Sequence, residues 1–147
     1  MLENRNINVC LVSDLFENYP LSENTIVVVV DLLRATTVIS TAFNFGVKEI
    51  IPVPSLEIAK TYIDREDFIV AAERNAMPIK GFDYGNSPFQ YMNNDILDKT
   101  LVLTTTNGTK AINIASSYEV ITSCFINIDA VEEFLLNSNK DVLILCS

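Results

Sequence analysis

Short apolar runs alternate with polar segments along the sequence, and one run has an unusual composition. Residues Thr25–Val30 contain four consecutive valines and are followed directly by Asp31. A continuous β-branched run bounded by polar residues is typical of a strand buried on both faces of a parallel sheet. An acidic residue at the carboxyl end of such a strand lies where open α/β sheets bind ligands. The alternative is that Asp31 only ends the strand and caps the next helix.

The same pattern predicts a series of strands and helices. The expected strands are Ile7–Ser13, Thr25–Val30, Lys48–Val53, Phe68–Ala72, Thr100–Thr105, Tyr118–Thr122 and Asp141–Cys146. The expected helices run from about Arg34 to Phe45, from the cap Ser55 to about Ile63, from the Thr106–Thr109 turn to about Ala115, and over Asp129–Leu136. A polar connection is expected over Asp14–Asn24, and Ser87 and Pro88 are expected to begin a further helix.

Strands that alternate with short helices indicate an α/β fold, which we predict to be a three-layer α/β/α arrangement with a largely parallel or mixed sheet. The 147 residues fit a single domain over residues 1–147. We expect this domain to be truncated at its C-terminal end, because the sequence stops on a strand without the helix that would cover it.

Composition narrows the function classes. The net charge of −9 disfavours a nucleic-acid partner, and an anionic substrate would need a locally positive pocket or a metal ion. The chain has no histidine, so histidine-dependent nucleophiles and histidine zinc sites are excluded within it. We predict that its three scattered cysteines are small core residues of a protein in the reducing cytoplasm. No signal peptide or membrane span is apparent in the sequence.

Three predicted strand ends carry unusual polar sets: Asp31 with Arg34, Thr36 and Thr37; Glu73-Arg74 with Asp83, Asn86 and Ser87; and Thr104–Thr109. Parallel strands would bring these sets to one edge of the sheet. Carboxylates suit Mg²⁺, arginines grip phosphate or sulfonate oxygens, and hydroxyl and N–H groups at a helix start cradle an anion. Each set also has a structural alternative: a helix cap, an exposed ion pair, or a turn.

Together these residues resemble the 2-phosphosulfolactate phosphatase family. The matching segments are VVVVDLLRATTVISTAF (Val27–Phe43), ERNAMPIKGFDYGNSP (Glu73–Pro88) and LTTTNGTKAI (Leu103–Ile112). The resemblance implies a Mg²⁺-dependent phosphatase that hydrolyses 2-phospho-3-sulfolactate to 3-sulfolactate and phosphate, a step of coenzyme M biosynthesis. It also implies a small anionic phosphate or sulfonate substrate. From the charge and the lack of an apolar span we expect no nucleic-acid and no membrane partner, and a homo-oligomer is left open.

We assign roles within these segments as hypotheses. Asp31 is the metal ligand or nucleophile, and the other predicted catalytic residues are Arg34, Glu73 and Arg74. Glu73 and Asp83 are further Mg²⁺ ligands or general bases, and the two arginines hold phosphate and sulfonate. The predicted substrate-binding residues are Thr36, Asn86, Ser87, Thr106 and Asn107. Without histidine, the nucleophile is either a metal-activated water or an aspartate.

Two rival functions follow from the same residues. A haloacid-dehalogenase-like phosphatase would need a second aspartate two residues after Asp31, where this sequence has Leu33. A non-catalytic domain that binds an acidic metabolite or a protein partner would bind an anion saturably without turning it over.

Overall fold

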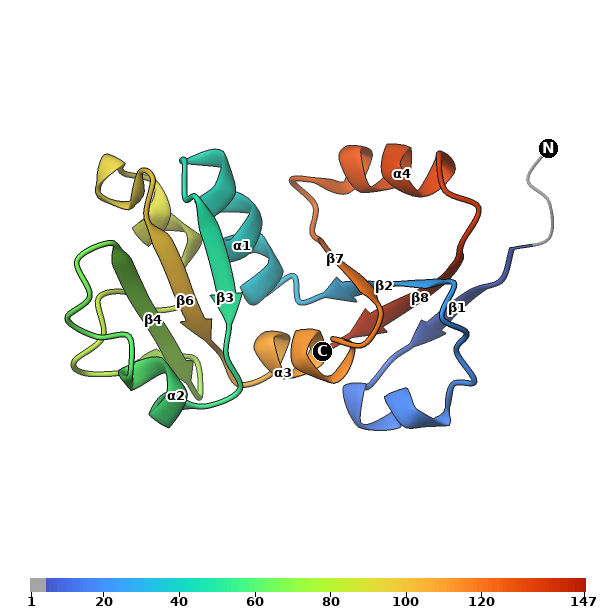
Figure 1. Cartoon of the computed structure of the whole chain (residues 1–147), viewed down its shortest axis with the longest axis horizontal. Coiled ribbons are helices and arrows are strands. Elements are labelled where there is room, and N and C mark those ends of the chain that lie inside the picture. Colours follow the sequence, from blue (N-terminus) through green and yellow to red (C-terminus); the bar gives the residue numbers. More distant parts are fainter. Residues whose placement is uncertain (1–4) are drawn as a thin grey trace.

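The computed structural model describes residues 5–147 and divides the strands between two sheets (Figure 1). The first, called here the β2 sheet, has the order β1-β8-β2-β7, and all its neighbouring strands are parallel. Its strands are β1 (Ile7–Cys10), β2 (Thr25–Val30), β7 (Glu119–Ser123) and β8 (Asp141–Cys146). The second, the β6 sheet, has the order β3-β6-β4-β5 and is parallel except for the β4–β5 hairpin. Its strands are β3 (Glu49–Pro52), β4 (Phe68–Arg74), β5 (Met77–Pro78) and β6 (Thr100–Thr104).

Helices connect the strands and cover both sheets. The α-helices are α1 (Ala35–Asn44), α2 (Leu56–Lys60), α3 (Gly108–Ile114) and α4 (Ile128–Leu136). The 3₁₀ helices within residues 5–147 are η1 (Ser13–Asn18), η2 (Pro88–Tyr91) and η3 (Asn94–Ile96). Figure 1 shows α1 and α3 in the middle of the molecule, between the two sheets.

Strand β2 is buried on both faces, as its valine run predicts. Val27 and Val29 are fully buried in a cluster with Leu143 of β8 and Ala111 of α3. Residues of opposite parity, such as Val28, pack on the other face, where α4 supplies Val131 and Leu135. Side chains alternate between faces along a strand, so only a run that is apolar at every position can serve two cores.

The β6 sheet is likewise covered on two sides. Ile69 and Ala71 of β4 pack with residues of α1 and η2, including Val38 and Tyr91. Val70, between them, packs with Ala59 of α2 on the opposite face. This alternation decides which side chains of β4 meet α1 and which meet α2.

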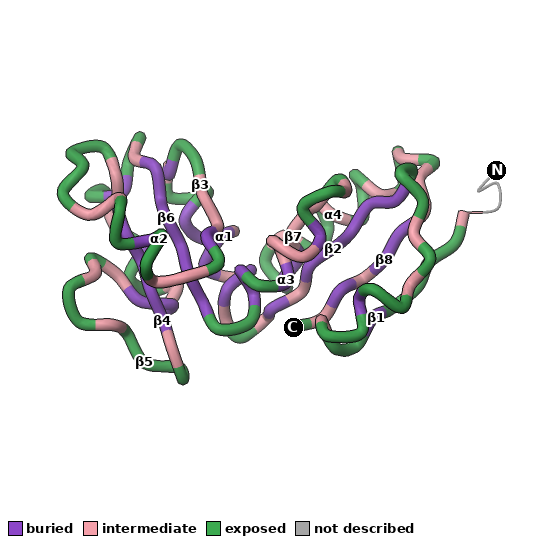
Figure 2. Tube along the Cα trace, turned by 60° about the horizontal axis from the view of Figure 1, so that its bottom comes forward, coloured by how far each residue is buried: buried purple, intermediate pink, exposed green. Residues whose placement is uncertain are grey.

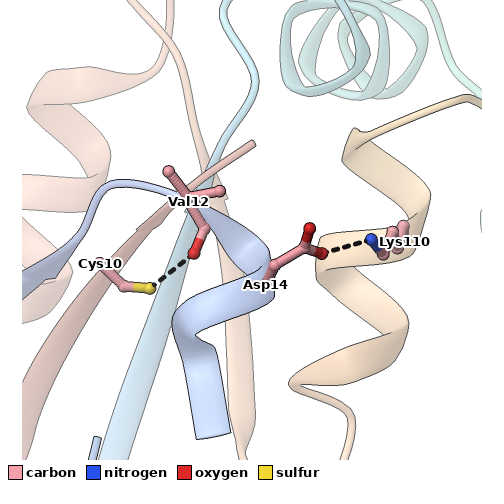
Figure 3. Close-up of polar contacts among 4 residues, drawn as sticks. All are labelled: Cys10, Val12, Asp14 and Lys110. Atoms are coloured by element: carbon pink, nitrogen blue, oxygen red, sulfur yellow. Dashed lines mark hydrogen bonds and ion pairs between the residues drawn. The ribbon is translucent and has the colours of Figure 1, made fainter. Parts of the chain in front are cut away.

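The predicted three-layer α/β fold with largely parallel strands is confirmed. The pattern did not reveal that the strands form two sheets. The first strand is also shorter than predicted: it ends at Cys10, whose Sγ donates to the Val12 carbonyl at 3.1 Å (Figure 3). The expected polar connection then begins with η1, where Asp14 forms an ion pair with Lys110 of α3 at 2.6 Å (Figure 3).

Burial is concentrated in the strands, as Figure 2 shows for β2, β6 and β8. Helix α4 differs from the other helices, because none of its nine residues is buried. Within residues 5–147, every helix is too short or too polar to cross a lipid bilayer.

Candidate active site

A cavity of about 200 Å³ lies where the end of β2 meets the ends of β4 and β6. It therefore draws on both sheets, and not on one shared sheet edge as the sequence predicted. Its lining residues are Asp31, Leu33, Arg34, Glu73, Asn75, Ala76, Asn86, Thr106 and Asn107.

Asp31 follows β2 and is only 8% exposed. Its backbone is held by Thr36, whose hydroxyl donates to the Asp31 carbonyl at 2.8 Å and accepts from the Asp31 N–H at 3.1 Å. Thr36 is fully buried and does not line the cavity, so the structure places it behind Asp31 rather than against a substrate. The hydroxyl thus provides an acceptor for the Asp31 N–H at the strand end, and the Asp31 carbonyl also accepts from the Thr36 N–H at 3.1 Å.

The carboxylate of Asp31 lies between the first turns of α1 and α3. Burial, helped by the nearby charge of Glu73, raises the pKa of Asp31 above its ordinary value of 3.8, although hydrogen bonds from the N–H groups of Ala35, Arg34 and Gly108 oppose this. Gly108 makes the close approach feasible, since a Cβ there would lie 2.6 Å from Asp31 Oδ2 and 2.4 Å from the Ala35 Cβ. Asp31 thus does meet a helix start, and its carboxylate also faces the cavity.

Glu73 reaches the same cavity from β4 and is 6% exposed. Its Oε1 accepts from the Ala76 N–H at 2.5 Å and from the Thr106 hydroxyl at 3.2 Å, and its Oε2 lies 3.5 Å from the Thr106 N–H. Side chains alternate along β4, so Glu73 lies on the same face of the strand as Ile69 and Ala71, the face that packs against α1. Its carboxylate therefore ties the β4–β5 turn to the loop after β6.

Arg74 does not line the cavity. As the next residue of β4, it lies on the opposite face of the strand, together with Val70, which packs against α2. Its guanidinium donates to the Glu73 carbonyl at 2.6 Å and to the Thr104 hydroxyl at 2.9 Å. The structure therefore separates two neighbours that the sequence predicted to act together.

The β4–β5 turn brings residues to the cavity that the sequence analysis missed. Asn75 and Ala76 both have positive φ, 52° and 61°, as the two central residues of a tight hairpin turn. The Ala76 carbonyl accepts from Arg34 Nη2 at 3.2 Å, which links the turn to the loop after β2. The asparagine at position 75 is the sequence feature that could have predicted this turn, since asparagine is favoured at positive φ. Leu33 also lines the cavity and is 91% exposed, and no sequence feature predicted its place there.

The segment Asp83–Ser87 is divided by the fold. Asn86 lines the cavity and is 6% exposed, with no hydrogen-bond partner for its Oδ1. Asp83 lies in a different hollow, where its Oδ2 accepts from the Val70 N–H at 2.8 Å beside β4. Ser87 precedes η2 without a capping hydrogen bond from its side chain, and it does not line the cavity.

Charge around the cavity is unbalanced. It is lined by two buried carboxylates, Asp31 and Glu73, and by one guanidinium, that of Arg34. The ion pairs found in residues 5–147, Lys110–Asp14 and Lys140–Glu119, include neither carboxylate. No three acidic or cysteine side chains of that range form a metal-binding group. Buried carboxylates without a cationic partner are costly, so this cavity suits a bound cation.

Residues 10–147 match the protein family described as 2-phosphosulpholactate phosphatase. This chain belongs to that family. The resemblance carried by the three sequence segments is thereby confirmed, and the cavity is built from residues of those same segments.

Curated relatives agree with this membership. A protein of Caldanaerobacter subterraneus, named a probable 2-phosphosulfolactate phosphatase, is 47% identical over 126 residues, covering 82% of this chain and 52% of that protein. Proteins of the same name from Clostridium novyi and Clostridium tetani are 44% and 41% identical, covering 85% and 95% of this chain and 54% and 61% of their own lengths. The chain thus spans about half the length of the curated relatives it matches.

Proposed function

We propose that this chain carries the catalytic site of a Mg²⁺-dependent phosphatase that hydrolyses 2-phospho-3-sulfolactate to 3-sulfolactate and phosphate, as in coenzyme M biosynthesis. The observation that carries the proposal is the pair of buried carboxylates, Asp31 and Glu73, which face one cavity with a single arginine. Family membership supports phosphate-ester chemistry, and the name of the relatives supports the substrate.

The donor set fits a magnesium ion. Asp31 and Glu73 supply carboxylate oxygens, which hard divalent cations prefer, and Mg²⁺ is often held by one or two carboxylates together with substrate phosphate. When bound, Mg²⁺ would offset the carboxylate charge and polarise a phosphoryl oxygen. Asp83 lies beside β4 in another hollow, so we leave it out of this set.

The remaining side chains would bind and orient the ester. The Arg34 guanidinium uses one nitrogen on the Ala76 carbonyl, and its other N–H groups would pair with phosphate oxygens. Asn107 would orient the second anionic group of the substrate from the loop after β6. In the overall reaction, a water oxygen adds to phosphorus and the bond from phosphorus to the ester oxygen breaks. One proton of the water passes to the released alcohol and the other stays with phosphate.

Release of inorganic phosphate tests the proposal directly. We expect release from phosphosulfolactate with Mg²⁺, less release from phospholactate, which lacks the sulfonate, and none with EDTA. The Asp31→Asn variant should be inactive, whereas Lys140→Gln, at an exposed ion pair, should match the wild type. The Clostridium tetani relative, 61% of which is covered by the match, serves as a longer protein for comparison. Saturable binding of the ester without any release would contradict the proposal and favour a non-catalytic metabolite-binding domain.

A further inference from the structure

Asn86 has a buried oxygen that nothing in the described chain satisfies. Its side chain lines the cavity with Asp31 and Glu73, is 6% exposed, and its Oδ1 has no hydrogen-bond partner among residues 5–147. Leaving a buried amide oxygen unpaired is costly, so an atom of this kind calls for a partner such as a water or an ion.

The chemistry of the cavity limits what that partner is. When ionised, the neighbouring carboxylates only accept hydrogen bonds, and so do the oxygens of an ionised phosphate or sulfonate. None of them can satisfy another acceptor. A cation can, because an amide oxygen is a normal ligand of hard divalent ions.

We propose that Asn86 Oδ1 is the third protein oxygen of a divalent-cation site formed with Asp31 and Glu73. This assignment rests on the proposed function for the presence of the cation. It gives Asn86 the place that the sequence analysis gave to Asp83, whose carboxylate is bonded to the backbone of β4.

A clamp on the preceding residue holds Asn86 in position. The Gly85 N–H donates to Gln90 Oε1 at 2.9 Å, and the Gly85 carbonyl accepts from the Tyr91 hydroxyl at 2.6 Å. Tyr91 is fully buried, and burial, with a smaller effect from Tyr84, raises its pKa, so it remains a donor. A Cβ on Gly85 would lie 3.0 Å from the Pro78 Cβ, so the backbone is also enclosed on that side. Gln90 and Tyr91 are therefore positioning residues for the Asn86 oxygen.

Mn²⁺ binding to the whole chain, measured by calorimetry, tests the assignment without using activity. Asn86→Ala should weaken Mn²⁺ binding about tenfold or more. Asn86→Asp replaces the neutral oxygen by a carboxylate of similar shape and should bind Mn²⁺ more tightly than the wild type. Misfolding cannot produce that second result. Wild-type affinity in Asn86→Ala, or weaker binding in Asn86→Asp, would overturn the assignment.

The clamp has its own test. Tyr91→Phe removes only the hydroxyl and should weaken Mn²⁺ binding about two- to tenfold, the effect of one lost hydrogen bond. In an Asn86→Ala background it should cause no further loss, because Tyr91 acts through Asn86. Tyr19→Phe is the matched control: its hydroxyl also donates to a backbone carbonyl, that of Val9 at 2.7 Å, but outside the cavity. Additive losses would overturn the positioning role.

The two proposals fail in different ways. If the wild type binds Mn²⁺ as expected but releases no phosphate, the cation site stands and the proposed function falls. If the wild type releases phosphate but binds no Mn²⁺, the assignment of Asn86 is overturned.

Discussion

Gly108 is the residue whose replacement tests the geometry of the cavity most directly. It begins α3 and is packed against the end of β2 and the start of α1. An alanine Cβ at this position would lie 2.4 Å from the Ala35 Cβ and 2.6 Å from Asp31 Oδ2. Both neighbours are buried and short, so the helix or Asp31 must shift.

The expected effect is a balance of two terms. Overpacking of a tight interior costs about 1–3 kcal/mol. Alanine is the better helix former by about 1 kcal/mol, although less at a helix start. Gly108→Ala should therefore lower the free energy of unfolding by about 1–2 kcal/mol, which corresponds to a fall in Tm of about 2–8 °C. Because either shift changes how the Asp31 carboxylate is held between the two helix starts, Mn²⁺ affinity should fall as well.

Urea unfolding with and without Mn²⁺ measures both effects. The double variant Gly108→Ala/Ala35→Gly removes the nearest clashing atom. We expect it to be at least about 1 kcal/mol more stable than the sum of the single changes implies. If Gly108→Ala unfolds like the wild type and binds Mn²⁺ equally well, the close packing of Asp31 between the two helix starts is refuted.

Three further predictions concern charge, backbone conformation and an exposed ion pair. Asp31→Asn should raise the free energy of unfolding in EDTA near pH 7, because the raised pKa of Asp31 means that folding disfavours its ionised form. This gain should shrink as the pH falls toward 3.8, where the carboxyl becomes protonated in the unfolded state as well. Urea unfolding at several pH values measures the gain, and a gain that does not change with pH would contradict the reasoning. Ala76→Gly should raise the free energy of unfolding by about 0.5–1 kcal/mol, because glycine adopts the positive φ of this turn without strain. The control Ala130→Gly, within α4, should lower it by about 1 kcal/mol. Equal effects of the two changes in thermal unfolding would contradict the reasoning. Lys110→Met, which breaks the exposed pair with Asp14, should change the unfolding free energy by less than about 1 kcal/mol at low salt and by less still at high salt, and a larger loss would be inconsistent with this exposed geometry.

Local sequence determined the elements that depend on local pattern. The valine run predicted Thr25–Val30 and the apolar run predicted Asp141–Cys146, and both strands have those bounds in the structure. Helix α1, expected from about Arg34 to Phe45, is observed as Ala35–Asn44. The sequence also selected Asp31, Arg34, Glu73, Asn86, Thr106 and Asn107, which all line the cavity. Their roles in catalysis stay predictions.

Tertiary structure decided which of the predicted residues meet. Glu73 and Arg74 are adjacent in sequence, but strand alternation sends one toward α1 and the cavity and the other toward α2. Asp83 and Asn86 are close in sequence as well, yet one bonds to β4 and the other faces the cavity. The sequence specified the chemical groups, because side-chain identity and local periodicity are local properties. Strand pairing across long sequence separations placed the groups from two sheets around one cavity, and no local pattern encodes that pairing.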